Sequence, residues 1–356
     1  MLGIVFQRTL NGSIKSNWSK AAHKIHNLAI QCISRRLSLQ QRIWHANTFL
    51  LSKIWFLSKV LPPRKLYTQQ IEKYIGYHIW RNSPYRISRD QLRLPLNKGG
   101  LNLANVEVKC QTLFIKYSDD IMAGTVDQFE YIFYQQFFGQ NSNSTSKLPA
   151  HIRPAFQKRT QLLTQGNQGL LPPTRKLYRT LIQELDITPR IVTKYTTVIW
   201  SNVWQNIHKS PMASEWRSSL YMFVNEAVVY GERLLRHGRS QTSLCTFCLS
   251  SETLQHKFVE CTSINNIWSW VLSSLQNKVK LPETCLNKIK QLQFDFTCEN
   301  KTKNAAMWLI AGYVHYIITS SKKKCLNEFK TTLRSFRWNL HKEQITYLFG
   351  KRLFFF

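Results

Sequence analysis

Apolar residues recur at helical spacing across residues 14–80, a stretch that contains no glycine before Gly76. The apolar positions of its central part are Ile43, Phe49, Leu50, Ile54, Leu57 and Leu61. Pro62 and Pro63 follow, and because proline has no amide hydrogen and a fixed φ, the pair should end this long helix. The spacing then predicts a second helix over about Tyr67–Trp80.

Helical patterning continues beyond residue 80, with interruptions. Glycine and proline mark irregular chain up to Gly99 and Gly100, and a further helix is expected over Ala104–Met122. The Asn- and Ser-rich run at 140–147 is the best linker candidate, and a second boundary is expected at 166–173. From residue 174 to 236 the pattern is helical again.

Strand-like patterning is confined to Gly3–Phe6 and to a short hairpin expected at a group of cysteines near residue 250. Residues 305–319 form the most apolar stretch, but it is too short for a bilayer span and contains His315, so a buried helix is the better reading. The sequence therefore predicts a mainly α protein without a transmembrane segment.

The sharpest chemical signal is the group Cys245, Cys248, His256 and Cys261, with spacing Cys-x2-Cys-x7-His-x4-Cys. Zinc prefers four soft or borderline donors in a tetrahedron, and a Cys-x2-Cys turn supplies two thiolates from one bend. Four protein ligands leave no position for an activated water, so the predicted cofactor is a structural Zn²⁺. The alternative is a set of unlinked buried thiols and a surface histidine. The other cysteines are expected in the core: Cys32, Cys110, Cys285, Cys298 and Cys325.

The chain carries 49 Lys and Arg against 19 Asp and Glu, a formal charge of +30. Such self-repulsion favours a polyanionic partner, RNA or DNA, over the alternatives of a generally basic surface or an anionic membrane face. Arg233, Arg236 and Arg239 precede the cysteine group and are candidate phosphate contacts. Trp268 and Trp270 follow it, and Trp268 lies at helical spacing with Ile264 and Leu272, which fits core packing better than base stacking.

No secretory signal begins the sequence, and most cysteines are scattered. A disulfide framework is therefore not expected. A reducing compartment, nuclear or cytoplasmic, follows from the free thiols, and no small-molecule substrate is indicated. The oligomeric state is left open.

Four stretches together resemble the C-terminal part of the polyprotein of a non-LTR (LINE-type) retrotransposon, downstream of the reverse transcriptase active site. LGIVF resembles the strand that leaves the polymerase palm, and LSLQQRIWHANTFLLSKIWFLSKVLPP resembles the helical thumb. RLPLNKGGLNLANVEVKCQTL resembles the linker after the thumb. WSNVWQNIHKSPMASEWRSSLYMFVNEAVVYGERLLRHG with CTFCLSSETLQHKFVECTSINNIW resembles the zinc-binding domain. The order and spacing of the four carry the resemblance.

The resemblance implies a thumb-like and linker region at 1–139, a linker at 140–173, a zinc-binding domain at 174–272 and a basic helical C-terminal region at 273–356. It also implies that thumb cations contact the backbone of a nucleic-acid duplex, namely Lys53, Lys59, Arg64 and Lys65, although the polar side of an amphipathic helix would look the same. Lys98 before Gly99 and Gly100 could reach a phosphate, while a plain turn with positive φ explains the same residues.

Catalysis is not expected from this chain by itself. The palm carboxylates of a reverse transcriptase would precede LGIVF, where only Met1 stands. Tyr117–Asp120 spells Tyr-x-Asp-Asp, but it follows the thumb-like helices and is interpreted as a solvent-exposed helix end. Asp295, Glu299 and Lys301 could suggest a nuclease, yet an exposed acidic loop is the commoner reading.

Two function classes stay open: a nucleic-acid-binding fragment with a structural zinc site, or a subunit or incomplete gene product of an RNA-directed DNA polymerase whose palm is encoded upstream.

Overall fold

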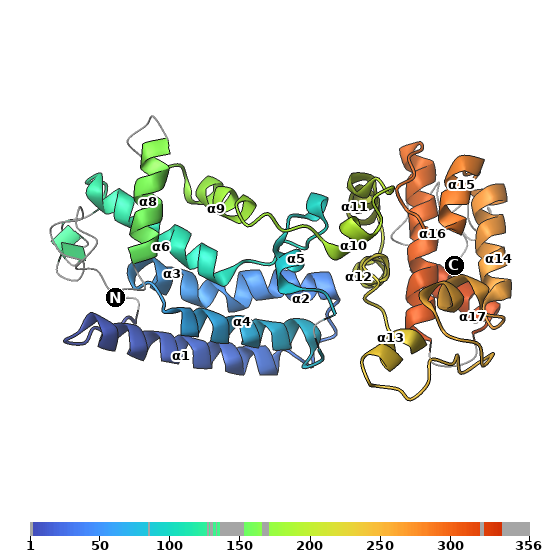
Figure 1. Ribbon diagram of the computed structural model, residues 1–356, viewed down its shortest axis with the longest axis horizontal. Helices are drawn as coiled ribbons and strands as arrows, with labels where there is room; N and C mark the ends of the chain where they lie inside the picture. Colours follow the sequence, from blue (N-terminus) through green and yellow to red (C-terminus); the bar gives the residue numbers. More distant parts are fainter. Residues whose placement is uncertain are drawn as a thin grey trace. The chain divides into compact units, whose positions relative to one another are not determined.

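The structure, a computed structural model, describes residues 3–84, 86–126, 128, 131–132, 134–135, 153–165, 171–320 and 324–336. These residues are mainly helical, as the sequence predicts, and they divide into two compact units. The first unit comprises Met1–Arg36, Arg42–Tyr85 and Leu103–Ile187, and the second comprises Leu37–Gln41, Arg86–Asn102 and Thr188–Phe356 (Figure 1).

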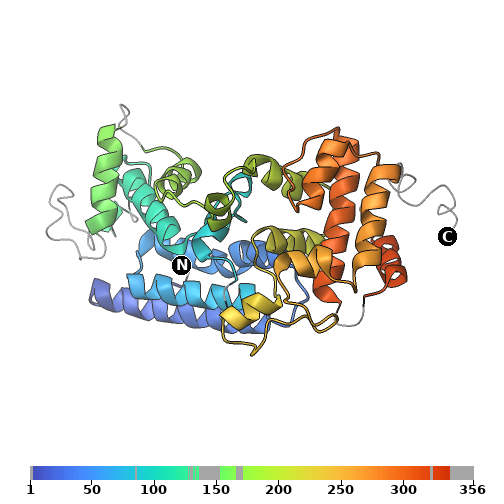
Figure 2. The same ribbon diagram turned by 45° about the vertical axis from the view of Figure 1, so that its right-hand side comes forward.

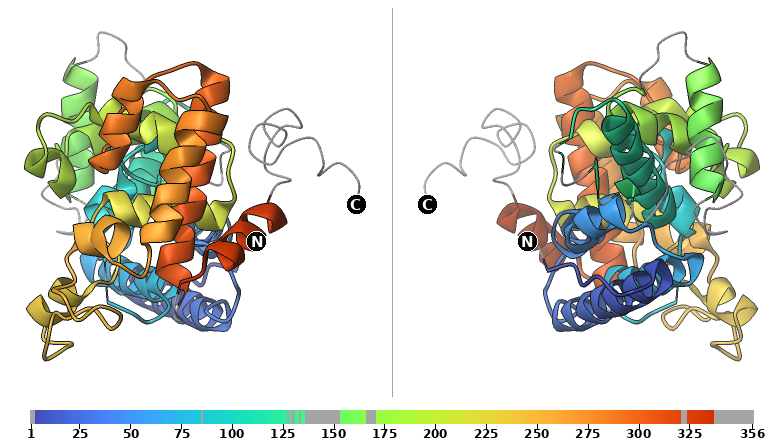
Figure 3. Two further views of the ribbon diagram at one scale, coloured as in Figure 1. Left: turned by 90° about the vertical axis from the view of Figure 1, so that its right-hand side faces the viewer. Right: turned by 90° about the vertical axis from the view of Figure 1, so that its left-hand side faces the viewer.

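The first unit is built on two long helices that lie side by side, α1 and α4 (Figures 1 and 3). Its elements are α1 (Leu10–Gln31), the part of α2 (Leu39–His45) from Arg42 onward, η1 (Ala46–Leu50), α3 (Ser52–Val60), α4 (Lys65–Trp80), α6 (Val106–Met122), α8 (Arg153–Gln165) and α9 (Thr174–Gln183). Thr9 caps α1 by accepting a hydrogen bond from the Gly12 amide at 3.1 Å. The buried Trp18 indole donates to the Leu61 carbonyl at 2.9 Å, which ties α1 to the end of α3.

The second unit surrounds α16, a helix whose residues are buried along most of its length (Figure 2). Its elements are α5 (Arg89–Arg93), η2 (Leu96–Lys98), α10 (Arg190–Lys194), α11 (Trp200–Lys209), α12 (Ser214–Val224), α13 (Gly231–Arg236), η4 (His256–Glu260), α14 (Asn265–Ser273), η5 (Ser274–Lys278), α15 (Glu283–Lys290), α16 (Asn300–Thr319) and α17 (Leu326–Ser335). The rings of Trp216 on α12 and Trp308 on α16 lie 5.0 Å apart, and Gly312 leaves room for Trp216. A methyl group at Gly312 would stand 2.9 Å from that indole.

Several predicted elements are confirmed. α3 ends at Val60, just before the two prolines, and α4 covers the predicted second helix. The apolar stretch 305–319 is part of the buried helix α16. None of the helices in the described residues is long and apolar enough to span a bilayer.

Two predicted elements are wrong. The helix expected from residue 14 to Pro62 is interrupted at 32–38 and again by the π turn η1. Gly3–Phe6 has no neighbouring strand in the described chain, and the Val5 backbone bonds instead to the Asn17 side chain, at 2.9 Å and 2.7 Å. A strand needs a partner for its backbone groups, and here a side chain takes that role.

The two units also divide the chain differently from the domain boundaries that the resemblance implies. Residues 174–187, expected in the zinc-binding domain, include α9, which packs against α6 in the first unit. Residues 86–102, expected in the thumb and linker region, belong to the second unit. Apolar contacts between residues far apart in sequence determine these groupings, so composition shifts along the chain do not reveal them.

A tight turn in the second unit requires both Gly99 and Gly100. Gly99 adopts φ +83°, and its carbonyl accepts a hydrogen bond from the Tyr221 hydroxyl at 2.8 Å. A Cβ at Gly100 would stand 1.9 Å from the Leu94 carbonyl oxygen, closer than real atoms approach. The predicted turn with positive φ is therefore confirmed at Gly99, and Gly100 is needed for a close backbone approach.

The core of the first unit contains His78, whose side chain is fully buried. Its ring centroid lies 5.0 Å from that of His45. Burial, followed by the nearby charges of His45 and Arg42, lowers the pKa of His78 from 6.5 to about 4. The ring is therefore neutral in the folded protein at neutral pH.

We expect the free energy of unfolding to decrease as the pH falls from 6.5 toward 4. In that window the unfolded chain binds a proton at His78 that the folded chain does not, which costs about 1.4 kcal/mol per pH unit at most. Urea unfolding at several pH values should show a shallower dependence for His78→Leu than for the unsubstituted protein. His23→Leu, at an exposed histidine of α1, is the control and should leave the slope unchanged.

Candidate metal centre

The first two candidate ligands lie in a tight loop. The Cys245 amide donates to the Ser250 carbonyl at 2.7 Å, and the Leu249 amide donates to the Cys245 carbonyl at 3.0 Å. One antiparallel bridge, Leu244 to Ser251, closes the loop, which confirms a very short hairpin. Leu249 adopts φ +61°, a conformation that bulky residues rarely take, and the reversal it makes follows directly after Cys248. The loop thus turns the thiols of Cys245 and Cys248 toward each other.

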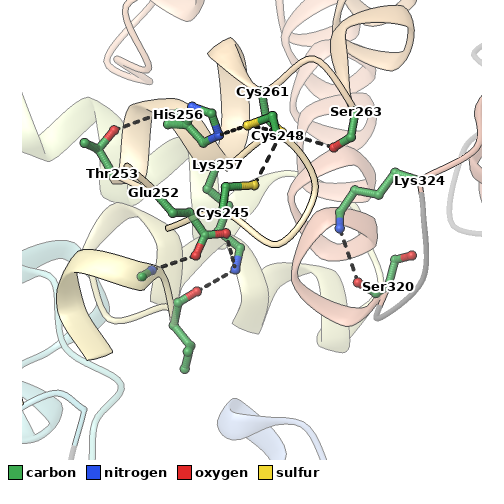
Figure 4. Close-up of polar contacts among 12 residues, drawn as sticks. Cys245, Cys248, Glu252, Thr253, His256, Lys257, Cys261, Ser263, Ser320 and Lys324 are labelled. Carbon is green, nitrogen blue, oxygen red and sulfur yellow. Dashed lines mark hydrogen bonds and ion pairs between the residues drawn. The ribbon is translucent and has the colours of Figure 1, made fainter. Parts of the chain in front are cut away.

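The other two ligands lie at the two ends of the π turn η4: His256 begins the turn, and Cys261 directly follows it. The Cys261 amide donates to the His256 carbonyl at 2.9 Å, five residues back. In an α-helix, residues five apart point about 140° away from each other around the axis. The wider π turn removes most of this divergence, and such turns recur at functional sites. The Thr253 hydroxyl caps the turn by accepting from the His256 amide at 2.8 Å (Figure 4).

The four ligand atoms converge within 4.8 Å of one another, and Figure 4 shows them facing a common point. The Cys245 and Cys261 sulfurs are 3.7 Å apart, and those of Cys261 and Cys248 are 3.9 Å apart. The Cys248 sulfur lies 3.2 Å from His256 Nε2. Tetrahedral zinc with Zn–S bonds of about 2.3 Å would separate its thiolates by about 3.8 Å. The group can hold a metal ion, and its spacing is compatible with zinc.

The surroundings shift the pKa values of the Cys248 and Cys245 thiols in opposite directions. A backbone hydrogen bond from Ser250 helps to lower the pKa of the Cys248 thiol to about 7, which favours the thiolate that binds metal. Burial raises the pKa of the Cys245 thiol. The Ser263 hydroxyl lies 3.1 Å from the Cys261 sulfur. Since a metal ion binds the thiolate, coordination would have to offset the burial of Cys245.

Two lysines lie close to the sulfurs. Lys257 forms an ion pair with Glu252 at 3.6 Å and donates to a backbone carbonyl. Lys324 donates to the Ser320 carbonyl at 3.3 Å, and burial followed by the charge of Lys257 lowers its pKa (Figure 4). Lys257 neighbours a ligand in sequence, but Lys324 is brought in by α16 and the chain after it, so the motif alone could not reveal it.

The metal centre is anchored to the helical core of the second unit. The Phe258 ring, fully buried in η4, lies 4.4 Å from the Phe223 ring on α12. The Tyr313 hydroxyl on α16 donates to the Phe258 carbonyl at 2.6 Å. The ligands of η4 are therefore held from behind by two helices. With four protein donors and no open position, the arrangement suits a structural metal ion rather than a catalytic one.

The candidate phosphate-contacting residues of the first unit are mostly accessible. Lys53 on α3 is exposed, as are Arg64 and Lys65 at the start of α4. Lys59 is half-buried, and its ammonium group lies 4.5 Å from the centroid of the Tyr117 ring. Lys59 therefore already makes a cation–π contact within the protein, and so does the exposed Lys53, whose ammonium group lies 5.1 Å from the centroid of the Phe49 ring.

In the second unit, Lys98 is exposed at the end of η2, and Arg236 and Arg239 are exposed at the end of α13 and just beyond it. Arg233 differs. Its guanidinium is half-buried and donates to the Glu226 carbonyl and to a second backbone carbonyl. Burial lowers the pKa of Arg233. This arginine holds backbone in place, so the three exposed cations are the better candidates for phosphate contact.

The Tyr-x-Asp-Asp sequence does not form an exposed helix end, contrary to expectation. Asp119 is 1% exposed in the last turns of α6. Its carboxylate accepts from the Leu171 amide at 3.1 Å and pairs with Lys116 at 3.2 Å, while Asp120 pairs with Lys116 at 3.0 Å. The acidic pair therefore joins α6 to the chain before α9, a structural role.

Asp295 is likewise buried, at 3% exposure, where an exposed acidic loop was expected. It accepts from the Ile199 amide at 3.1 Å and pairs with Lys288 at 3.1 Å. Among the described residues, the only group of three or more metal-binding side chains is the one at Cys245. The structure therefore does not gather a nuclease centre at Asp295.

The two tryptophans after the cysteine group differ in exposure. Trp268 is buried, with its ring 5.1 Å from that of Tyr313, so the core reading is confirmed. Trp270 is half-buried and packs edge-on against Phe329. The ammonium groups of Lys330 on α17 and Lys278 in η5 lie 5.2 Å and 5.4 Å from the centroid of the Trp270 ring.

No known protein family matches this sequence, and a search of curated proteins finds no similar sequence. The candidate function therefore rests on the residues and geometry above.

We expect the purified chain to contain one equivalent of zinc, measured by elemental mass spectrometry. Removal of the ion with a strong chelator should unfold the segment from about Arg233 to Trp270, since a small site of this kind owes much of its folding free energy to the metal. Circular dichroism and limited proteolysis would report the loss, and re-addition of zinc should reverse it. An apoprotein with the same spectrum and cleavage pattern would contradict the assignment.

Cys248→Ser should reduce zinc content and lower the thermal unfolding midpoint of the second unit, because a hydroxyl is a poor substitute for a thiolate ligand. The matched control is Cys325→Ser, the same change at a thiol outside the ligand group that is exposed, contrary to the expectation that it lies in the core. The control should retain one zinc ion and its midpoint. Equal zinc content in both variants would show that Cys248 is not a ligand.

Proposed function

We propose that this chain binds RNA or DNA through exposed cations on its helices, and that a structural zinc ion at Cys245, Cys248, His256 and Cys261 positions part of that surface. The observation that carries the proposal is the position of Arg236 and Arg239 beside a closed Cys3His ligand group. Their side chains are exposed, and the structure gives them no ion pair with another described residue.

Residues 245–261, the zinc segment, bond to the chain at both ends of residues 233–242, which carry Arg236 and Arg239 and are called the cationic loop. The Gly231 amide donates to the Glu252 carboxylate at 2.6 Å, and the Glu232 amide donates to the Glu252 carbonyl at 3.1 Å. The Glu252 amide donates to the Ser243 carbonyl at 2.7 Å. Glu252 therefore bonds to the chain on both sides of the loop that carries Arg236 and Arg239: to Gly231 and Glu232 before the loop, and to Ser243 after it. A metal ion that fixes Glu252 would also fix the ends of this loop.

Electrostatics supports a polyanionic partner. A formal charge of +30 raises the free energy of the compact state by self-repulsion, and neutralisation by phosphates would relieve it. Release of condensed counterions from the nucleic acid would then drive binding without sequence specificity. All eight cysteines are free, which supports a reducing compartment such as cytosol or nucleus.

We further propose that the chain is the thumb, linker and zinc-binding part of a LINE-type reverse transcriptase. The support is the order of the four sequence stretches together with the Cys-Cys-His-Cys spacing. In such a protein the exposed cations at Lys53, Arg64, Lys65 and Lys98 would hold the phosphates of a template or primer. The chain by itself is proposed to bind and not to polymerise.

Affinity for a fluorescent duplex or single strand should fall steeply between about 50 and 200 mM salt, as measured by anisotropy. The double variant Arg236→Gln/Arg239→Gln should bind more weakly and give a logarithmic salt slope shallower by about two, one for each lost phosphate contact. Arg334→Gln/Lys280→Gln removes the same charge from exposed positions of the second unit away from the loop and should keep the slope. A salt-independent affinity would contradict the proposal.

A further inference from the structure

A pocket of about 380 Å³ opens in the second unit next to the metal centre. α10, the end of α12 and α13 line it, together with residues 253–255 before η4 and residues 291–294 after α15. Its volume falls within the range of about 300–1,000 Å³ that is typical of small-molecule sites. Gln255, which lines the pocket, directly precedes the ligand His256.

The pocket lining carries a small excess of positive charge, with Arg190, Lys194 and Arg236 against Glu226 and Glu232. Arg190 and Arg236 line it, and neither guanidinium has a hydrogen bond or ion pair with another described residue. Of the two carboxylates in the lining, that of Glu226 is already engaged: Lys194 pairs with it at 2.5 Å and the Tyr195 hydroxyl donates to it at 2.7 Å. The remaining positive charge favours an anionic ligand.

The neighbouring Arg233 strengthens this preference. Its own guanidinium is used to bind backbone carbonyls, but its charge remains. Burial lowers the pKa of Arg233, and the charges of Arg190 and Arg236 add to this shift, while Tyr230 and Glu226 oppose it. Three guanidinium groups therefore repel one another beside the cavity, and a bound phosphate would relieve that repulsion.

Aromatic rings and amides form the rest of the lining. Tyr195 is 42% exposed and Trp200 is half-buried. The Trp200 indole is held rigidly, because it donates to the Tyr195 carbonyl at 2.9 Å and stacks on Trp204 at 5.2 Å. The amide side chains are those of Gln255, Gln291 and Gln293. Rings can stack on a nucleobase, and glutamine can donate to and accept from its edge.

We propose that this pocket binds a single nucleotide unit, with the base against Tyr195 or Trp200 and the phosphate at Arg190 and Arg236. The inference deepens the proposed function and rests on it, since the nucleotide would normally belong to the bound strand. The same chemistry would also admit a free mononucleotide. The glutamines favour a base that offers a donor and an acceptor side by side, as adenine does.

The test uses the zinc-loaded full chain and follows tryptophan fluorescence and calorimetry with adenosine monophosphate as the probe. We expect saturable binding of the monophosphate and at least tenfold weaker binding of adenosine, which lacks the phosphate. Arg190→Gln should weaken the monophosphate about tenfold, the loss expected for one charge-assisted hydrogen bond. Arg334→Gln removes an exposed arginine elsewhere in the unit and should bind as the unsubstituted protein does.

Competition distinguishes the two sources of the nucleotide. If adenosine monophosphate lowers the affinity of a labelled ten-nucleotide adenine strand, the pocket holds a nucleotide of that strand. If it binds without competing, the pocket holds a free nucleotide. Absence of saturable monophosphate binding, or equal binding by Arg190→Gln, overturns the pocket assignment. If the pocket assignment fails but the chain still binds a strand with the expected salt slope, the proposed nucleic-acid binding stands. If the chain does not bind a strand, the proposed function and the pocket assignment are both contradicted.

Discussion

Convergence of three sulfurs and one imidazole nitrogen is the constraint on which the second unit depends. Sulfurs 3.7–3.9 Å apart gain little from one another as thiols, and as thiolates they would repel. The proposed divalent ion would replace this crowding with four short bonds. Because the segment also carries Glu252, whose backbone and carboxylate close the cationic loop, coordination chemistry and the placement of Arg236 and Arg239 are physically coupled.

Few acidic residues balance the large positive charge, and several of those are used inside the fold. Asp119 and Asp295 are buried and accept backbone amides that join distant segments. Glu226 is engaged with Lys194 and Tyr195. Glu226 and Asp295 each pair with only one lysine, Lys194 and Lys288, so these carboxylates leave most of the surface cations without a counterion. Several of the few carboxylates thus form bonds within the fold, while positive charge remains exposed. This exposed positive charge is the electrostatic basis for proposing a polyanionic ligand.

The metal centre and the pocket share supporting elements. Residues 253–255 line the cavity and directly precede the candidate ligand His256. Phe223 contacts Phe258 behind the ligands and also contributes to the pocket wall. Loss of the metal would therefore disturb both the cationic loop and the cavity, and a rigid η4 would keep the pocket formed before a ligand enters.

The sequence by itself determined the helical class, the end of a helix before Pro62 and the identity of the four residues that could hold a metal ion, because these depend on local periodicity, on proline geometry and on ligand spacing. Only the tertiary structure decided that Asp119 and Asp295 are buried, that Arg233 holds backbone, and that Lys324 approaches the sulfurs. It also decided the π turn that aligns His256 with Cys261 and the pocket at Arg190. Each of these depends on contacts between residues far apart in the chain, whose partners no local pattern specifies.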